Sequence, residues 1–236
     1  QRRDQFDHLV IETTGLADPA PVIQTFFVDE DIQTQLALDA VITVVDAKHI
    51  WQHWDSDEAQ EQIAFADVIL LNKIDLVTED ELAELERRIK EMNAMVKIYR
   101  TQNSDLAIES ILGVKAFDLD RALEVDPDFL TEDAHEHDDE VYSFAIVEEQ
   151  PLDSDKLSAW VNDLLQTKGP DIFRMKGILN LKDEPNRFVF QGVHMIFDGR
   201  PDRPWKPSET PRSEMVFIGR NLDEEAIRKG FRTCLA

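Results

Sequence analysis

Short apolar runs alternate with helical patterns in the first part of the chain. Runs rich in Val, Ile and Leu occupy residues 8–11, 40–45, 67–71 and 96–99. Such runs are typical of strands buried on both faces of a parallel sheet. Between the last two runs, residues 79–93 carry apolar residues at helical spacing. The alternation predicts right-handed parallel crossovers, in which ligands bind at the carboxyl ends of the strands.

The pattern changes after residue 140. Residues 154–166 have the apolar spacing of a helix, and Asp223 is placed to cap a last helix that carries Ile227 and Phe231. Strands are predicted at 141–148, 173–181, 187–197 and 214–219. One sheet with helices on a face is the pattern of a small α+β domain.

An acidic segment separates the two patterns. Residues 124–140 contain nine acidic and no basic residues, together with Pro127. Such composition is typical of a solvated linker. We therefore predict an α/β fold in which a unit with a parallel sheet, residues 1–123, precedes the linker. The smaller α+β domain follows at residues 141–236.

Charge and composition exclude several classes of protein. A formal net charge of −24 repels nucleic-acid phosphates, so the expected partners are cations. No apolar run approaches the roughly 18 residues of a membrane span. The single cysteine, Cys234, allows no internal disulfide and no cysteine-rich zinc site, which fits a reducing cytoplasm. The chain begins with Gln1 and has no signal peptide, so we expect its start to be a cut or processed end.

A candidate base-binding loop follows the run at 67–71. Asn72, Lys73 and Asp75 have the residue types of a guanine-recognition element. A carboxylate at Asp75 accepts hydrogen bonds from the ring N–H and the exocyclic amine of guanine, which adenine does not offer. The stem of Lys73 is suited to cover the base, and the amide of Asn72 is suited to hold the loop in place by hydrogen bonds. The simpler alternative is a polar loop that closes a strand.

A second candidate follows the first run, in the sequence Glu12-Thr13-Thr14-Gly15. A carboxylate and two hydroxyls at the end of a strand are suited to hold Mg²⁺ and to sense a terminal phosphate, and Gly15 allows unusual dihedral angles. The alternative is an ordinary turn, since Thr, Gly, Asp and Pro are common loop residues. Asp46, after the run at 40–45, either faces the same site or begins the next loop.

The motifs together resemble the CobW family. The resemblance rests on residues 6–27, on VVDA at 44–47, on NKID at 72–75, and on residues 174–205 and 212–219, which include QGVH and RPW. It covers nearly the whole chain. It implies that the α/β unit is part of a P-loop NTPase-type parallel sheet, from a GTPase domain of the SIMIBI class, and that the CobW C-terminal α+β domain follows. It also implies a protein that couples binding and hydrolysis of GTP with Mg²⁺ to delivery of zinc, cobalt or another metal to client proteins.

Site residues follow from the same resemblance. Glu12 and Gly15 occupy the switch motif, and Asn72, Lys73 and Asp75 the base site. Two hallmarks of the family do not occur in the printed sequence: the phosphate loop G-x-x-x-x-G-K-[ST] and the cysteine motif C-x-C-C. Both would precede Gln1. We therefore expect a truncated chain that by itself binds GTP poorly and transition metal weakly.

The remaining signals have two interpretations each. His135 and His137 offer imidazoles for weak metal capture, although a solvating linker is favoured because mobile ligands must be ordered. His194 is either a structural imidazole, which we favour, or a ligand. A proline-rich loop containing Arg203, Trp205 and Arg212 is a candidate partner-docking surface or an ordinary packed loop.

Three hypotheses follow for function. The first is a cytoplasmic GTPase metallochaperone with a client metalloprotein, in which Glu12 organises Mg²⁺ or the attacking water. The second is a non-catalytic metal-binding or docking module that retains the C-terminal domain. An ATP-using relative is the third, and Asp75 disfavours it. The identity of the metal and of the client, and the oligomeric state, have no signal in these residues.

Overall fold

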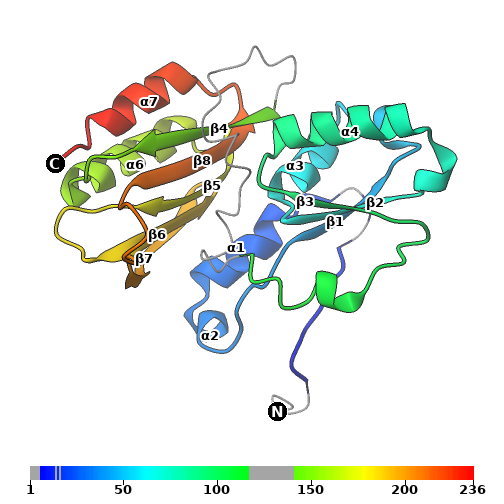
Figure 1. Ribbon diagram of the computed structural model, residues 1–236, viewed down its shortest axis with the longest axis horizontal. Coiled ribbons are helices and arrows are strands. Elements are labelled where there is room, and N and C mark those ends of the chain that lie inside the picture. Colours follow the sequence, from blue (N-terminus) through cyan, green and yellow to red (C-terminus); the bar gives the residue numbers. More distant parts are fainter. Residues whose placement is uncertain (1–5, 14, 16, 117–140) are drawn as a thin grey trace.

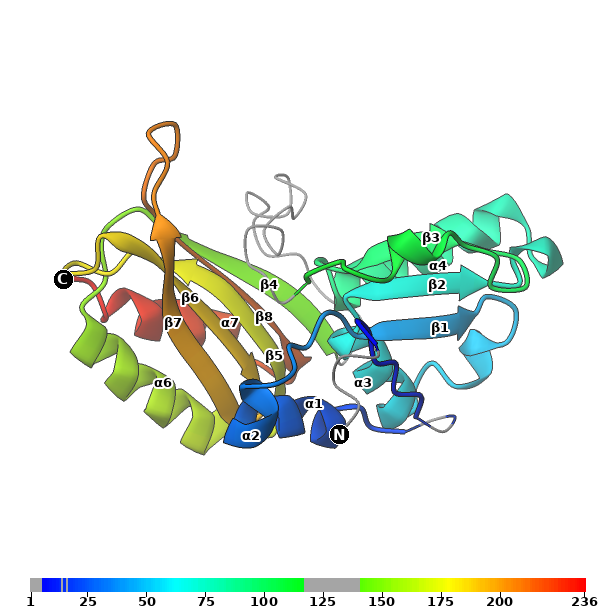
Figure 2. The same ribbon diagram turned by 90° about the horizontal axis from the view of Figure 1, so that it is seen from below.

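A three-stranded parallel sheet forms the first part of the molecule. The computed structural model describes residues 6–13, 15, 17–116 and 141–236, so the predicted linker 124–140 lies outside the described residues. The strands are in the order β1-β2-β3, with bounds β1 Ile42–Asp46, β2 Val68–Asn72 and β3 Lys97–Arg100. Asp46 is in register with Asn72, so β1 and β2 end side by side. Their arrowheads point away from the second sheet (Figure 2).

Helices pack around this sheet. Their bounds are α1 Ala20–Val28, α2 Glu30–Gln33, α3 Asp57–Phe65 and α4 Glu79–Met92. Short 3-10 helices lie at η2 Ile50–Gln52, η3 Ile74–Leu76 and η4 Ile108–Ser110. A capping box starts α4, because the Thr78 hydroxyl accepts from the Glu81 N–H while the Glu81 carboxylate accepts from the Thr78 N–H at 2.7 Å. The apolar face of α4 is buried as predicted.

An antiparallel sheet of five strands forms the second part. Its order is β4-β8-β5-β6-β7, with bounds β4 Val141–Glu148, β5 Ile172–Leu179, β6 Asn186–Val193, β7 Ile196–Pro204 and β8 Ser213–Arg220. Helices α6 Ser154–Lys168 and α7 Glu224–Arg232 lie along one face of this sheet (Figures 1 and 2). Asp223 caps α7 as predicted, accepting from the Ala226 N–H at 2.9 Å. The predicted fold class, a parallel α/β unit followed by a separate α+β sheet, is confirmed.

Two strand predictions were wrong. Residues 8–11 form no strand, and Leu9, Val10 and Ile11 are 53–76% exposed. An apolar run becomes a buried strand only when neighbours bond and cover it, and here even Val44 of β1 is 57% exposed. Residues 187–197 are not one strand, because a turn with His194 at φ 51° separates β6 from β7.

Strand β7 was also missed, because Pro201 and Pro204 made its residues resemble a loop. Within the second sheet, β7 pairs only with β6 and is therefore an edge strand. Proline is tolerated there because its missing N–H faces outward instead of breaking an interior ladder. The segment between β7 and β8 projects beyond the sheet (Figure 2).

The two parts meet around a buried group of charges. Asp67, directly before β2, accepts from Lys176 Nζ at 2.8 Å and also pairs with Arg174, both of which lie on β5. All three side chains are 4–5% exposed. Because Asp67 stands at the amino end of β2, the second sheet contacts the edge of the parallel sheet opposite to its carboxyl ends. Among the described residues, no helix combines the length and apolar character needed to cross a bilayer.

Candidate functional site

The carboxyl ends of the parallel strands gather the predicted base-binding residues. Asn72 ends β2, and its side-chain oxygen accepts from the Ser104 N–H at 2.9 Å and from the Thr101 hydroxyl at 3.2 Å. These bonds attach the loop after β3 to the end of β2. The Thr101 N–H donates to Leu71 at 2.8 Å, which extends the pairing beyond the last strand residue. Asn72 therefore fixes two neighbouring loops in one arrangement.

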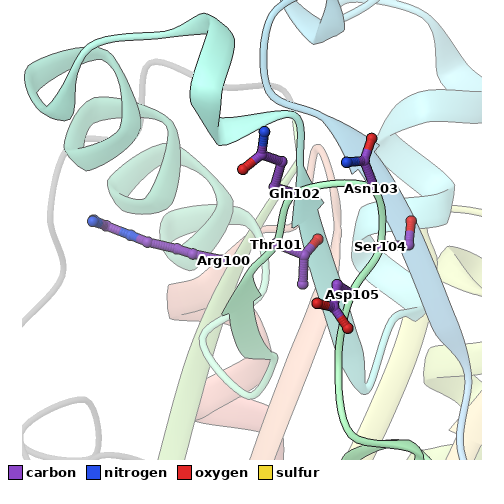
Figure 3. Close-up of a pocket in the computed structure, with 6 residues that line it drawn as sticks. All are labelled: Arg100, Thr101, Gln102, Asn103, Ser104 and Asp105. Atoms are coloured by element: carbon purple, nitrogen blue, oxygen red, sulfur yellow. The ribbon is translucent and has the colours of Figure 1, made fainter.

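The loop after β3 lines a pocket of about 670 Å³. Its lining residues are Arg100, Thr101, Gln102, Asn103, Ser104 and Asp105 (Figure 3). Arg100 points away from the other five and binds Glu79 and Glu86 of α4. Asn103 and Ser104 both have positive φ, near 55°, a conformation in which strain is often retained for function. The pocket is an open depression of the surface with a mostly polar lining.

Lys73 also has a left-handed backbone, with φ 62° and ψ 35°. A non-glycine residue in this conformation costs about 1–3 kcal/mol, which surrounding contacts must offset. Its ammonium donates to Asp46 Oδ2 at 2.6 Å. Burial by itself would raise the pKa of Asp46, but hydrogen bonds from Lys73 and His49 outweigh it and hold that pKa well below its usual value.

Asp75 lies in η3, the short helix that starts two residues after β2 ends. Its side chain is exposed, and so it is accessible to a ligand. Asn72, Lys73 and Asp75 therefore lie in one segment at the end of β2, and Asn72 bonds this segment to the loop after β3.

The predicted switch residues precede α1, where they are exposed or bonded to α3. Glu12 and Thr13 are exposed, and within the described ranges no hydrogen bond or ion pair joins either to Asp46 or Asn72. Gly15 is fastened instead to α3, because the Gln62 amide donates to its carbonyl at 2.9 Å and to that of Ala17 at 3.0 Å. Gly15 has φ 32°, an unusual backbone conformation that glycine adopts readily.

Comparisons with known proteins cover both parts of the chain. The family model "CobW/HypB/UreG, nucleotide-binding domain" matches residues 1–100, and "Cobalamin synthesis protein cobW C-terminal domain" matches residues 141–235. The chain belongs to the CobW family. The match of residues 1–100 includes both predicted motifs, and that of residues 141–235 includes all five strands of the second sheet.

Several CobW-family relatives are named for zinc. The chain is similar to the zinc chaperone YjiA of Escherichia coli, with 38% identity over 96% of this chain and 70% of the relative. It is 32% identical to zinc-regulated GTPase metalloprotein activator 1 of Schizosaccharomyces pombe, covering 94% of this chain and 62% of the relative. The zinc chaperone CobW of Pseudomonas aeruginosa is 31% identical over all of this chain and 68% of its own length. The chain thus spans about two thirds of these relatives.

A solved structure shows the same fold. The Zn(II)-bound YjiA GTPase from Escherichia coli matches with a TM-score of 0.81 and 34% identity, covering 98% of this chain and 72% of that chain. Within the described part of the CobW-family chain, no group of three or more His, Cys, Asp or Glu side chains is suited to hold a metal ion. His135 and His137 lie outside the described residues.

The remaining sequence candidates have local partners. His194 packs edge-on against Phe65 and Phe173, with ring centroids 5.4 and 5.5 Å apart, which favours the structural interpretation of this imidazole. Arg203 binds Glu209 through two hydrogen bonds, at 2.6 and 2.8 Å, and so orders the turn after β7.

His194 is expected to make stability depend on pH. Burial, first, and the positive charge of Arg220 lower its pKa from the ordinary 6.5, against the opposing effect of Asp18 and a hydrogen bond with the Gly169 backbone. The unfolded chain therefore binds more protons below pH 6.5, and stability falls as the pH is lowered through 6.5 toward the folded-state pKa. Urea unfolding between pH 7.5 and 5 measures this slope. His194→Asn, which tolerates positive φ, should reduce the slope, whereas His53→Asn at an exposed site should not.

Two features of the site were missed, one with a weak sequence signal and one with none. The loop 101–105 could have been suspected from its run of Thr, Gln, Asn, Ser and Asp directly after a strand. The pairing of Asp46 with Lys73 could not, because the two residues are 27 positions apart and meet only through the register of β1 and β2.

Proposed function

We propose that the protein containing this chain is a GTP-binding and GTP-hydrolysing metallochaperone, with zinc as its cargo. One observation carries the nucleotide part of the proposal: Asn72 joins the base-recognition loop to a pocket-lining loop at the carboxyl ends of parallel strands. Binding at that edge is the rule for open α/β sheets. The names of the relatives support zinc over cobalt.

Each residue has a proposed part in binding. The exposed Asp75 carboxylate accepts from the N–H and amine of guanine, and the stem of Lys73 covers the base. The backbone of the loop 101–105 closes the other side of the base. Glu12, Thr13 and Gly15 form the switch segment, in which Glu12 would help to hold Mg²⁺ or to orient the attacking water. Bound Mg²⁺ would neutralise charge on the phosphates.

The fit to Mg²⁺ is incomplete among the described residues. Glu12 is exposed and so remains open to a ligand, whereas Asp46 is already filled with hydrogen-bond donors. The proposal also includes a first domain that ends at residue 123 and a second that begins at residue 141. The protein is proposed to be cytoplasmic and to have a client metalloprotein as its partner.

Calorimetric titration tests the nucleotide part. GDP, GTP and ADP are titrated into this chain and into an extended form. The extended form also contains the residues that the gene encodes before Gln1. We expect guanine nucleotides, but not ADP, to bind the extended form tightly, because the phosphates contribute much of the affinity. Absence of nucleotide affinity in both forms would contradict the proposal and favour the non-catalytic docking module.

The metal part is tested separately. Zinc affinity of the extended form is measured by competition with a chelator, in the presence of GDP and of a non-hydrolysable GTP analogue. A metallochaperone whose switch acts on the metal must bind zinc with different affinity in the two states, and linkage makes the effect reciprocal. Equal zinc affinity in both states would refute the coupling.

A further inference from the structure

The carboxylate of Asp46 is surrounded by donors at the end of β1. Oδ1 accepts from the main-chain N–H groups of Lys48 and His49 at 3.0 and 3.1 Å. Oδ2 accepts from Lys73 Nζ at 2.6 Å and contacts His49 Nδ1 at 3.0 Å. A carboxylate offers about four lone-pair sites, and these contacts fill them. Asp46 is therefore an anchor for other side chains, and no longer an open ligand for a cation.

The bond between Asp46 and Lys73 crosses from one strand end to the next. Lys73 directly follows β2, and Asp46 is the last residue of β1. The lysine side chain is 47% exposed, so its aliphatic stem remains accessible while its ammonium is held. Lysine has one of the largest side-chain entropies, and an unrestrained lysine must be ordered when a ligand binds.

We propose that Asp46 is a positioning residue that holds the Lys73 stem ready to cover the purine base. The inference rests on the proposed guanine-nucleotide binding and adds a residue to that site. The stem covers the flat face of the base and does not distinguish its polar edge. Asp46 therefore contributes to affinity equally for every purine, whereas Asp75 determines which purine is preferred.

A double-mutant cycle tests the role. Affinities of the full-length protein for GDP, IDP and ADP are measured for Asp46→Asn, for Lys73→Met, and for the double variant. Methionine keeps an unbranched apolar stem and removes the ammonium. We expect Asp46→Asn to lower the affinity for all three nucleotides by the same factor, about three- to tenfold. This is the cost of ordering one long side chain when the ligand binds. In the Lys73→Met background the same substitution should change affinity less than twofold.

Three outcomes would overturn the role. These are an unchanged affinity in folded Asp46→Asn, an equal loss with and without the Lys73 ammonium, or an altered ratio of GDP to ADP affinity. Thermal unfolding verifies that each variant is folded. If Asp46→Asn does not fold, Lys73→Met tests the same Asp46–Lys73 pair. Asp80→Asn, an exposed carboxylate at the start of α4, is the matched control. If the wild-type protein has no guanine preference, the proposed function fails too; a preference with a neutral Asp46→Asn overturns only the present inference.

Discussion

Asp67→Asn is expected to lower the free energy of unfolding by about 3–5 kcal/mol, the range for breaking a buried ion pair by removing one partner. The substitution keeps the shape of the side chain and removes its charge. Arg174 and Lys176, both about 5% exposed, would then lose the buried carboxylate with which both of them pair. Urea unfolding at pH 7 measures the loss.

The position of Asp67 explains why the effect should be large. Its Oδ2 accepts from the Val41 N–H at 2.8 Å, and its carbonyl accepts from the Lys97 N–H at 3.0 Å. The same residue thus joins the starts of β1, β2 and β3 to β5 of the second sheet. One hydrophobic cluster also spans this junction, since it includes Phe65 and Ile69 from the first part and Phe173 and Val216 from the second. Loss of the charge disturbs both parts together.

Two controls separate burial from charge. Asp57→Asn removes another carboxylate at the same junction, where it pairs with Arg220 at 2.9 Å, but Asp57 is 69% exposed and should cost at most about 1 kcal/mol. Lys176→Met should cost less than Asp67→Asn, because burial and the adjacent Arg174 lower the Lys176 pKa to about 8 and the Asp67–Arg174 pair remains. Equal losses for Asp67→Asn and Asp57→Asn would show that the buried charges do not hold the parts together.

The sequence predicted elements well where local signals agreed. Helix α4 has a capping pattern and a regular apolar face, and it was found at 79–92. Strand β4 was found at 141–148 as predicted. Errors arose where structure depends on distant partners. Residues 8–11 have the composition of a strand but no pairing neighbour among the described residues, and β7 contains prolines that only its place at the sheet edge explains.

The candidate site shows the same division. The motif Asn72–Asp75 could be assigned to a strand end because the preceding run was plainly apolar. Its partners at residues 101–105 and at Asp46 come from two other strands, and only the sheet register brings them together. The charge group of Asp67, Arg174 and Lys176 was not predicted, because each residue alone looks like an ordinary surface charge in the sequence.

Asp75→Asn is expected to lower the affinity of the full-length protein for GDP by about 100-fold. The carboxylate would lose two charge-assisted hydrogen bonds, each contributing about 1.5–3 kcal/mol, although the new amide oxygen recovers part of one. Affinity for ADP should change little, because adenine offers neither donor at those positions. Competition with a fluorescent GDP analogue measures both nucleotides in one assay.

Xanthosine diphosphate makes the test sharper. Xanthine has a carbonyl oxygen where guanine has the amine, and the side-chain amide introduced by Asp75→Asn can donate an N–H to it, so this variant should prefer XDP to GDP. Because Asp75 is exposed in η3, its substitution should leave stability within about 0.5 kcal/mol of the wild type. Asp80→Asn should alter neither ratio. If Asp75→Asn keeps the wild-type preference for GDP over ADP and XDP, then guanine is not bound by this carboxylate, whatever else the strand ends hold.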